Sequence, residues 1–486
     1  MNLASLIRSH ARNRPDAIAV VQGDEQIDYA ALWCRIEMAA HRLLELGVEP
    51  GDRVGLCLGD HITHLALHYA VAAVGAVILP IDHRWTAAEK QQVASAFNAR
   101  LVLREADEAK VEGAQNEAVG CDWGGSDSGA VPIAALDSQA DSTLMVSLSS
   151  GTTGQPKGAL VTHGQMYERF VNQWVTLGLG SSDRFVSVTP LYFGAARSFC
   201  MGFLAAGATV ILDPPPHKPA ELAAAIAGSG ANITFLVPTL MHRLLPLASE
   251  AELMFPDLDL LIFGGSIVHG EEALEMQARL TPHLASYYAT SEGGGISVLH
   301  SLDIAQHGDT VGRPAFRVEV DVVDAHNKAV PQGETGRLRY RGPGVATAFL
   351  DEEGNLDANS GDGWFYPGDL ASIDADGYVS LRGREKEMII RGGVNVYPAE
   401  LETALRTHPG ITEAAVVGWP SPAMGEDVAA FVVGEPDIRS DDLLEYCRTR
   451  LAPYKVPKEI FVVDEMPKTN FGKIKKADLI AMLPQL

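Results

Sequence analysis

The stretch Ser149-Ser150-Gly151-Thr152-Thr153-Gly154-Gln155-Pro156-Lys157-Gly158 is the most informative segment of the sequence. Its glycines let the backbone approach a phosphate closely, its hydroxyls offer hydrogen-bond donors, and Lys157 supplies a positive charge. The stretch is not a Walker A loop, because Lys157 is followed by Gly158 and a strand-like run instead of a hydroxyl residue that opens a helix. It predicts a phosphate-binding loop that leads into a strand, and the density of suitable residues disfavours the alternative of a polar surface loop.

The residues around this loop predict an α/β fold in two domains. A chain of 486 residues is too long for one core, since single cores stop growing at roughly 250–300 residues. Up to residue 383, Ala- and Leu-rich helical stretches alternate with short β-branched runs, a pattern typical of helices packed on mainly parallel sheets. After Gly383 the alternation becomes shorter and of α+β type. We therefore predict a large N-terminal domain of helices packed on mixed β-sheets, residues 1–383, and a small α+β C-terminal domain, residues 384–486.

Individual elements follow from the same patterns. The expected N-terminal strands are 53–58, 185–189, 209–212, 233–237 and 260–263, and the Gly-, Ser- and Asp-rich stretch 114–130 is expected to be a surface loop. The expected C-terminal elements are a helix at 399–407, strands at 414–418 and 428–433, and a helix at 441–450.

Charge and cysteine content exclude several classes of function. The formal net charge of −24 argues against nucleic acid and against anionic membranes, because both need a basic surface. The longest apolar stretch, 65–81, is interrupted by His68 and Pro80, so it predicts a core helix that runs into a strand and no membrane insertion. The five cysteines form no C-x-x-C pair and the N-terminus lacks a signal-peptide pattern, so we expect reduced thiols and a cytoplasmic location.

A second landmark is Tyr287-Tyr288-Ala289-Thr290-Ser291-Glu292. A carboxylate close to a hydroxyl and an aromatic ring suits a magnesium nucleotide, because Glu292 can hold the metal and Tyr288 can stack on a base. With the phosphate loop before it and further motifs after it, the chain resembles the superfamily of acyl-CoA synthetases, nonribosomal-peptide adenylation domains and beetle luciferase, and is most similar in pattern to acyl- or aryl-CoA ligases. Ala289 and Ser291 depart from the Tyr-Gly-x-Thr-Glu pattern of that superfamily.

The resemblance implies binding sites for ATP, Mg2+ and coenzyme A. Glu292 would be the metal ligand, and the nucleotide and coenzyme A would be bound by Ser149, Ser150, Gly151, Thr153, Gly154, Lys157, Gly264, Gly265, Ser266, Tyr288, Ala289, Ser291, Asp369, Arg384, Lys386, Gly392 and Gly393. Asp369 would accept hydrogen bonds from both ribose hydroxyls, since a carboxylate offers two acceptor oxygens. Without the resemblance, residues 384–387 form only a charged turn, and Gly392-Gly393 is as well explained by a bulge or hairpin turn.

The last landmark is Pro467-Lys468-Thr469-Asn470-Phe471-Gly472-Lys473-Ile474. The resemblance implies that Lys473 is the catalytic lysine, which acts with Glu292 and Thr152 to stabilise charge when a carboxylate attacks the α-phosphorus of ATP. It also implies a mobile C-terminal domain. Rotation about a hinge at Lys386 would withdraw Lys473 and present the glycine pair for attack by a thiol.

The acid itself is less well defined by the sequence. By resemblance its pocket would be formed by Phe193, Gly194, Ala195, Tyr287 and Gly293. Aromatic and small walls suit an aromatic or medium-length apolar acid. An α-amino acid is disfavoured, because residues 190–212 contain no carboxylate to pair with its ammonium group.

Alternative functions and partners remain open. A stand-alone adenylation enzyme that loads an aryl or acyl acid onto a carrier protein is the main alternative, and an inactive homologue that only binds ligands is a third hypothesis. A carrier protein and a second copy of the chain in a homodimer also stay open as partners. Arg197 could pair with a second substrate carboxylate, although a surface or structural role is the preferred interpretation, and Arg84 could contact a phosphate of coenzyme A.

Overall fold

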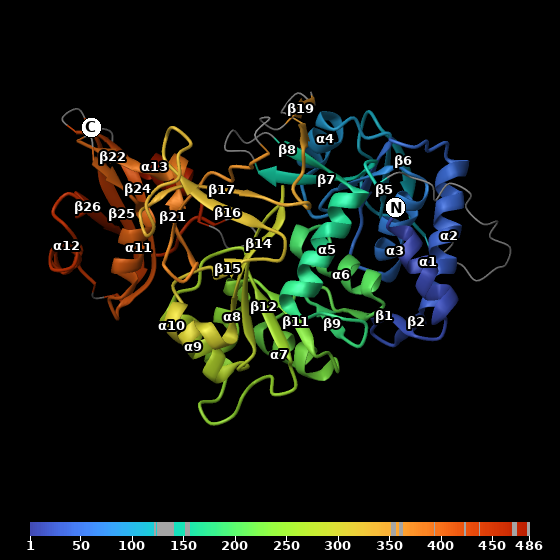
Figure 1. The fold of residues 1–486 in the computed structure, drawn as a ribbon, viewed down its shortest axis with the longest axis horizontal. Helices are drawn as coiled ribbons and strands as arrows, with labels where there is room; N and C mark the ends of the chain where they lie inside the picture. The colour runs from blue at the N-terminus through green and yellow to red at the C-terminus, as the bar shows by residue number, and fades with distance from the viewer. Residues whose placement is uncertain are drawn as a thin grey trace. The chain divides into compact units, whose positions relative to one another are not determined.

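The structure is a computed structural model of the chain (Figure 1). It describes residues 1–120, 123, 140–150, 156–350, 356–358, 363–392, 394–421, 424–436, 438–468 and 474–483. The contacts divide the chain into two compact units, Met1–Glu319 with Tyr340–Phe365, and Val320–Arg339 with Tyr366–Leu486. This division differs from the boundary that we predict at residue 383, because the sheet that contains residues 369–384 packs with the C-terminal elements. A hinge is a property of motion and not of packing, so the hinge at Lys386 stays a prediction.

A nine-stranded sheet forms the centre of the first unit, with strand order β15-β14-β13-β12-β11-β9-β10-β1-β2. Its strands from β13 to β1 are parallel, and β2, β14 and β15 are antiparallel to their neighbours. Parallel strands are covered on both faces, which explains why β10 and β11 are buried at every residue. The strands are β1 (Ile18–Gln22), β2 (Glu25–Asp28), β9 (Arg184–Ser187), β10 (Thr209–Leu212), β11 (Ile233–Leu236), β12 (Leu260–Phe263), β13 (Leu284–Thr290), β14 (Gly294–His300) and β15 (Arg313–Pro314).

An eight-stranded mixed sheet has the order β19-β18-β8-β7-β4-β3-β5-β6. One prediction is corrected here: Gln115–Ala118, within the expected surface loop 114–130, forms β6, which pairs in parallel with β5 at the sheet edge. An edge strand tolerates polar residues, since one of its sides faces away from the sheet. The strands are β3 (Arg53–Cys57), β4 (Val77–Pro80), β5 (Leu101–Arg104), β6 (Gln115–Ala118), β7 (Thr143–Ser150), β8 (Pro156–Thr162), β18 (Ala348–Leu350) and β19 (Leu356–Ala358).

The predicted core helix that runs into a strand is confirmed as α3 (Ile62–Ala73) followed by β4. Nearly every residue of α3 is buried, as expected for a helix that is apolar on all sides. In the part of the chain that the structure describes, no helix combines the length and the hydrophobicity needed to cross a membrane. The other helices of this unit are α1 (Ala4–Asn13), α2 (Tyr29–Glu45), α4 (Ala87–Ala96), α5 (His163–Leu177), α6 (Gly194–Ala206), α7 (Pro219–Gly228), α8 (Pro238–Leu244), α9 (Gly270–Arg279) and α10 (Ile304–His307), with short 3-10 turns η2 (Leu245–Leu247) and η3 (Ser301–Asp303).

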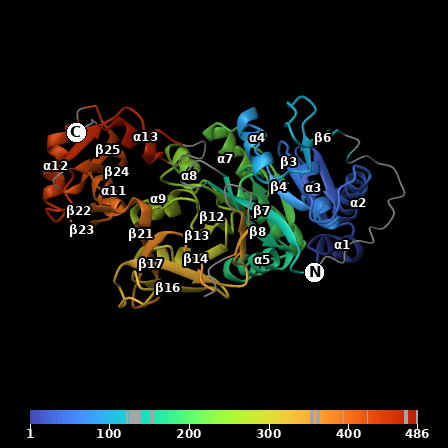
Figure 2. The same ribbon diagram turned by 90° about the horizontal axis from the view of Figure 1, so that it is seen from above.

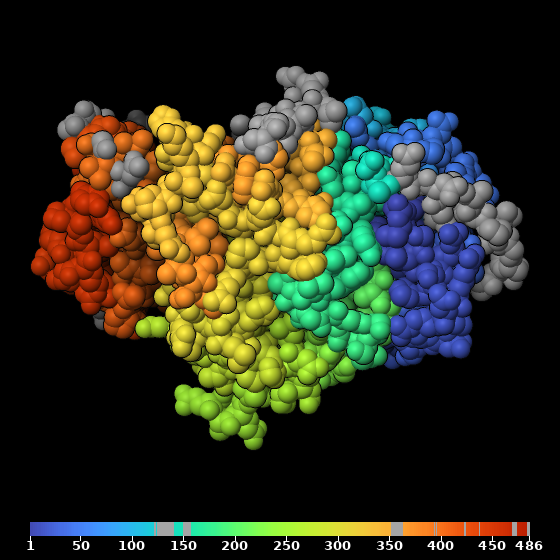
Figure 3. All heavy atoms as spheres, viewed as in Figure 1, coloured from blue at the N-terminus to red at the C-terminus, as the bar shows by residue number. Residues whose placement is uncertain are grey.

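Helix α5 begins directly at the end of β8, the strand that carries Lys157. Thr162, the last residue of β8, caps α5 by accepting a hydrogen bond from the backbone N–H of Gln165, whose side chain bonds back to the Thr162 N–H. Figures 1 and 2 both place α5 beside β8 and β14. Helix α6 follows β9 and ends at Gly207, which has a φ of 85°. The light-green loop after η2 projects into solvent (Figure 3), and residues 249–253 are all exposed.

In the described part of the second unit, two sheets pack with three α-helices. A sheet of order β16-β17-β20-β21 contains β16 (Glu319–Val323), β17 (Gly336–Arg341), β20 (Asp369–Ile373) and β21 (Val379–Arg384). The 3-10 turn η4 (Glu385–Glu387) follows it. A five-stranded sheet contains β22 (Ile389–Arg391), β23 (Val394–Val396), β24 (Ile411–Ser421), β25 (Gly425–Gly434) and β26 (Glu459–Val462). The helices are α11 (Pro398–Arg406), α12 (Ser440–Arg448) and α13 (Lys476–Met482), so the four C-terminal elements that the sequence predicts are present.

Candidate active site

The predicted pocket residues meet at one edge of the nine-stranded sheet. From β9 the chain passes to β10 on one side, and it then crosses to β11 on the other side of β9. In open α/β sheets, ligands bind outside the carboxyl ends of the strands at such a reversal. Strands β9, β11, β12 and β13 are parallel neighbours, so the residues that follow them lie at the same edge. The predicted acid pocket and part of the predicted nucleotide site therefore share this edge.

Aromatic side chains surround the predicted acid pocket. Phe193 precedes α6 and is half-buried, and its ring centre lies 6.5 Å from that of Phe235 at the end of β11. The ring of Phe199 lies 5.5 Å from Phe235 and 5.6 Å from Tyr287. The predicted site does not include Phe235 or Phe199. The position of Phe235 near the end of an expected strand could have indicated that it lies close to the site. Gly194 is exposed and Ala195 is half-buried in the first turn of α6.

Two predicted site residues, Gly264 and Tyr287, are in direct contact. A Cβ atom at Gly264 would lie 2.5 Å from the backbone oxygen of Tyr287, so the close approach of β12 and β13 at this point requires glycine. Burial raises the pKa of the Tyr287 hydroxyl to about 12, and the phenol is therefore neutral at physiological pH. After Gly264 the chain leaves the sheet, and Gly265, with a φ of 96°, and Ser266 are exposed.

The predicted metal ligand, Glu292, lies in the turn between β13 and β14. Thr290 pairs with Gly294, so Ser291, Glu292 and Gly293 form the turn, and Gly294 has the left-handed φ of 73° that such three-residue turns favour. The Gly293 N–H donates to Thr290 Oγ1 over 3.1 Å. Among the residues that the structure describes, the half-buried Glu292 carboxylate has no hydrogen-bond or ion-pair partner. A carboxylate with both oxygens available fits a magnesium ion.

The remaining residues of this motif are more exposed. Tyr288 is half-buried, whereas Ala289 and Ser291 are exposed at the end of β13 and in the turn. The Thr290 hydroxyl lies 2.5 Å from the hydroxyl of Tyr340, a residue that sequence reasoning did not select. Tyr340 also occupies the space that a side chain at Gly293 would need. The tip of the β13–β14 turn is therefore held from inside and leaves Glu292 at its surface.

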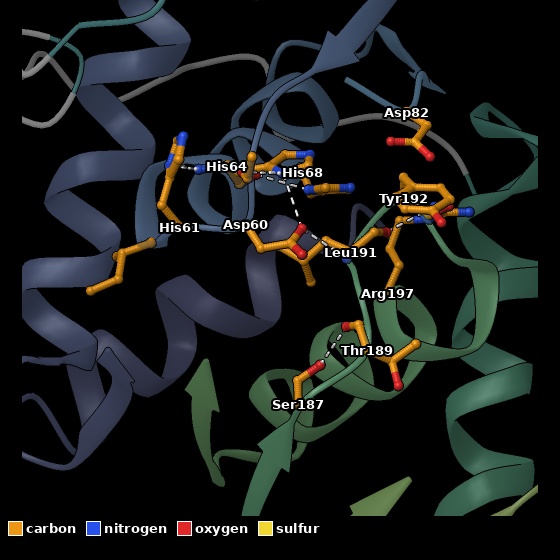
Figure 4. A network of polar contacts seen from close by, with 12 residues as sticks. Asp60, His61, His64, His68, Asp82, Ser187, Thr189, Leu191, Tyr192 and Arg197 are labelled. Atoms are coloured by element: carbon orange, nitrogen blue, oxygen red, sulfur yellow. Dashed lines mark hydrogen bonds and ion pairs between the residues drawn. The ribbon is translucent and has the colours of Figure 1, made fainter. Parts of the chain in front are cut away.

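The loop before α6 is held by a buried polar network (Figure 4). The Leu191 N–H donates to Asp60 Oδ1 over 2.9 Å. Arg197 Nη1 donates to the carbonyls of Leu191 and Tyr192 over 3.1 and 2.8 Å. Arg197 is 4% exposed, and burial lowers its pKa to about 10. These bonds support the structural interpretation of Arg197, since they tie down the backbone directly before Phe193.

Arg84 holds the same loop from the other side. It pairs with Asp82 through a contact of 3.1 Å from Nε to Oδ1, and its Nη2 donates to the Tyr192 hydroxyl. Its guanidinium carbon also lies 4.9 Å from the centre of the Tyr192 ring. The side chain is 47% exposed, and contact with a phosphate of coenzyme A stays a prediction.

Part of the predicted phosphate loop lies outside the described residues, namely Gly151, Thr152, Thr153 and Gly154. For Ser149 and Ser150 the structure describes only the backbone, which pairs Ser149 with Lys157 and Ser150 with Pro156 in the antiparallel β7–β8 ladder. Lys157 is exposed at the start of β8. A Cβ atom at Gly158 would lie 2.9 Å from the Phe97 ring, so packing inside the sheet accounts for this glycine and phosphate contact is not needed to explain it.

The second unit carries the other predicted nucleotide residues. Asp369 is 6% exposed at the start of β20, and Arg384 Nε lies 3.0 Å from its Oδ1. Arg384 also donates to the carbonyl of Pro367 over 2.8 Å. The structure thus pairs two residues that the sequence assigns to the same ligand. Lys386 is exposed within η4.

Of the predicted C-terminal residues Gly392, Gly393 and Lys473, the structure describes only Gly392. It follows β22 with a φ of 58°, and Arg391 pairs with Val394 across the antiparallel β22–β23 ladder, which agrees with the hairpin-turn interpretation. Gly393 and Lys473 lie outside the described residues, so their roles stay predictions.

Comparisons with known proteins show the family of the chain. Residues 7–350 match the model of the AMP-binding enzyme family, and residues 400–473 match that of the AMP-binding enzyme C-terminal domain. A feruloyl-CoA synthase of Amycolatopsis sp is 32% identical over 96% of each chain. A long-chain-fatty-acid–CoA ligase of Mycobacterium tuberculosis is 31% identical over 98% of each chain. The crystal structure of ATP-bound MatB from Rhodopseudomonas palustris superposes with a TM-score of 0.87 at 26% identity, over 99% of each chain.

Proposed function

The chain belongs to the AMP-binding enzyme family and is an ATP-dependent, AMP-forming acid–thiol ligase, and we propose that it joins an aromatic or medium-length apolar acid to coenzyme A. The observation that carries the proposal is the shared edge of the nine-stranded sheet. There, the aromatic side chains around Phe193 and Tyr287, which we assign to the acid pocket, share the carboxyl ends of the strands with the turn that carries Glu292. An acid bound in this pocket would meet a nucleotide whose metal is held by Glu292.

The lining of the pocket supports an apolar acid. Phe193, Phe235 and Tyr287 supply aromatic rings to the proposed pocket, and Gly264 places no side chain there, since a Cβ atom would collide with the Tyr287 backbone. Such surfaces gain free energy from burying apolar area, at about 25 cal/mol per Å2. Among the described residues, the charged groups at the loop before α6 include Asp60, Asp82, Arg84 and Arg197, and each of them is bonded within the protein. An acid with a second charged group would therefore find no unused partner here.

In the first half-reaction, a carboxylate oxygen of the acid attacks the α-phosphorus of ATP, forms the acyl-AMP and releases pyrophosphate. Two anions must approach each other, so the main task of the protein is to offset their repulsion. Glu292 would hold Mg2+, which neutralises phosphate charge when it is bound. Lys157, Thr152 and Thr153 would hold the phosphates, Lys473 would stabilise the charge on the attacking and bridging oxygens, and Asp369 would hold the ribose.

In the second half-reaction, the thiol of coenzyme A attacks the acyl carbonyl and AMP leaves. Lys473, which stabilises adenylation, is no longer needed at that carbon. The reaction now needs a path for the pantetheine arm of coenzyme A. We infer that the C-terminal part rotates about Lys386, which withdraws Lys473 and brings Gly392 and Gly393 to the site. A glycine pair leaves room for a thin ligand close to the backbone.

Pyrophosphate exchange into ATP tests the proposal. The purified protein would be assayed with a panel of benzoates, arylpropenoates, fatty acids and dicarboxylates, and the acids that support exchange would then be offered with coenzyme A or with a carrier protein. We expect exchange with aromatic or medium-length apolar acids, no exchange with dicarboxylates, and thioester formation with coenzyme A. Exchange only with dicarboxylates, or acyl transfer only to the carrier, would contradict the proposal.

A further inference from the structure

Arg169 is a buried arginine to which neither the predicted site nor the proposed reaction assigns a role. It lies near the middle of α5 and is only 6% exposed. No carboxylate of the described residues forms an ion pair with it. Burial lowers its pKa to about 10, so the guanidinium remains charged at neutral pH. A buried charge is costly unless it is fully hydrogen-bonded, and the bonds that Arg169 makes are therefore informative.

All of these hydrogen bonds go to backbone carbonyls of two short segments. Arg169 Nη1 and Nη2 donate to the carbonyls of Ser291 and Glu292 over 3.2 and 2.6 Å. Its Nε donates to the carbonyl of Gly344 over 2.8 Å. The guanidinium is a rigid planar fork with five donors, so it defines the position of several acceptors at once in a way that a lysine ammonium does not.

The surrounding backbone is shaped around the arginine side chain. A Cβ atom at Gly294 or at Gly344 would lie 2.9 Å from Arg169 Cγ, so both segments approach the arginine as closely as only glycine allows. The carbonyl of Glu292 accepts a second hydrogen bond, from the Ala346 N–H over 2.8 Å. The turn that carries Glu292 is therefore bonded to α5 and to the segment 344–346 at the same point.

We propose that Arg169 is a positioning residue for the metal-binding turn: its guanidinium fixes the backbone of Ser291 and Glu292, so that the Glu292 carboxylate is held where Mg2+ binds. The inference rests on the proposed function, which assigns Mg2+ to Glu292. Groups that orient a metal ligand without touching the metal commonly change metal affinity by about 10- to 100-fold when they are removed.

Helix α5, which carries Arg169, directly follows the strand that carries Lys157. Helix α5 starts at the end of β8, and β8 starts one residue before Lys157. Gln165, in the first turn of α5, donates to the carbonyl of Val345 over 2.9 Å, so a second contact ties α5 to the segment that supports the turn. Helix α5 therefore links the strand that carries Lys157 to the turn that carries Glu292, and Arg169 provides the hydrogen bonds to that turn.

Equilibrium binding of Mn2+ to the protein with a non-hydrolysable ATP analogue tests this inference without turnover. Arg169→Met removes the donors and retains an unbranched side chain, and Arg169→Lys retains the charge but not the fork. We expect Arg169→Met to weaken Mn2+ binding by about 10-fold or more, with Arg169→Lys in between.

Arg197→Met is the matched control. Arg197 is equally buried in the neighbouring helix α6, its pKa is also lowered to about 10, and it too donates only to backbone carbonyls, but those belong to the loop before Phe193. We expect a similar loss of thermal stability in the two methionine variants, unchanged Mn2+ affinity in Arg197→Met, and a raised KM for the acid in that variant.

The outcomes distinguish a wrong metal assignment from a wrong positioning role of Arg169. If the wild-type protein binds no Mn2+ with the nucleotide, the metal assignment within the proposed function fails. If the wild type binds Mn2+ and Arg169→Met binds it equally well, or if both methionine variants weaken binding to the same extent, the positioning role of Arg169 is overturned. Should Arg169→Met not fold, the same comparison between the wild type and Arg169→Lys decides the question.

Discussion

Replacing Asp60 by asparagine should change how the stability of the protein depends on pH. Asp60 lies directly before α3, with its carboxylate buried against the loop that leads to Phe193, and it accepts a hydrogen bond from the Leu191 N–H over 2.9 Å (Figure 4). Burial raises the pKa of this carboxyl from 3.8 to about 6, although the Leu191 bond and the charge of Arg84 act in the opposite direction. Ionised Asp60 therefore costs stability in the folded state.

The sign of the effect follows from the raised pKa. A carboxyl whose pKa is higher in the folded than in the unfolded state stabilises the fold at low pH, and that contribution is lost as the pH rises from 3.8 through about 6. The rise from 3.8 to about 6 corresponds to about 3 kcal/mol at about 1.36 kcal/mol per pH unit. Asparagine keeps an acceptor for the Leu191 N–H and has no charge. Asp60→Asn should therefore be more stable than the wild type at pH 8, by up to about 3 kcal/mol.

Thermal unfolding of the two proteins between pH 5 and pH 8 measures this difference. The unfolding entropy of about 2.1 cal/mol/K per residue, over roughly 350 residues of the first unit, converts 3 kcal/mol into about 4 °C. Between pH 5 and pH 8 the stability advantage of the variant should grow by about 1.4 kcal/mol. This value corresponds to the interval of about one pH unit between pH 5 and the folded pKa of about 6. The low pKa of buried His68, about 3, destabilises both proteins at acidic pH and cancels in the difference.

Asp24→Asn, which alters an exposed carboxylate in the turn between β1 and β2, is the matched control and should leave the Tm unchanged at every pH. A constant difference between Asp60→Asn and the wild type from pH 5 to pH 8 would refute the reasoning. So would a variant that is less stable at pH 8, since the Leu191 hydrogen bond would then outweigh the cost of burying the charge.

Three further predictions concern the site. Lys473→Ala should abolish pyrophosphate exchange but largely retain thioester formation from supplied acyl-AMP, and an equal loss of both half-reactions would argue against two arrangements of the C-terminal part. Asp369→Asn should raise the KM for ATP by about 10-fold or more, because hydrogen bonds to a charged group contribute about 1.5–3 kcal/mol, and an unchanged KM would remove Asp369 from the nucleotide site. Gly158→Ala should destabilise the protein by about 1–3 kcal/mol through overpacking against Val146 and Phe97, so an unaltered Tm would show that both side chains can move aside.

Much of the fold could be predicted because hydrophobic patterns are local. The strands expected at 209–212 and 260–263 have the observed bounds, and α3 with β4 follows the interpretation of residues 65–81. Strand β6 was missed because polar residues at a sheet edge look like a loop. The contacts group residues 320–339 with the C-terminal elements, and the sequence does not indicate this grouping, since sheet pairing between segments that are distant in sequence leaves no periodic signal.

The residue types of the site were decided by the sequence alone. Glycines and hydroxyls next to Lys157, a carboxylate after Tyr287-Tyr288, and Lys473 near the end of the sequence are chemically suited to a nucleotide wherever the fold puts them. Their order along the chain was sufficient to identify the family and the class of reaction.

Only the tertiary structure decided how these residues are held. Arg169 is separated from Glu292 by more than a hundred residues, and Asp60 from Leu191 by still more, so no local pattern marks either pair. Their roles arise from burial, which makes a charge costly unless nearby backbone groups satisfy it. Burial is a property of the packed sheets and helices, and this is why the chemistry of the site could be inferred from residue types while its support became visible only in three dimensions.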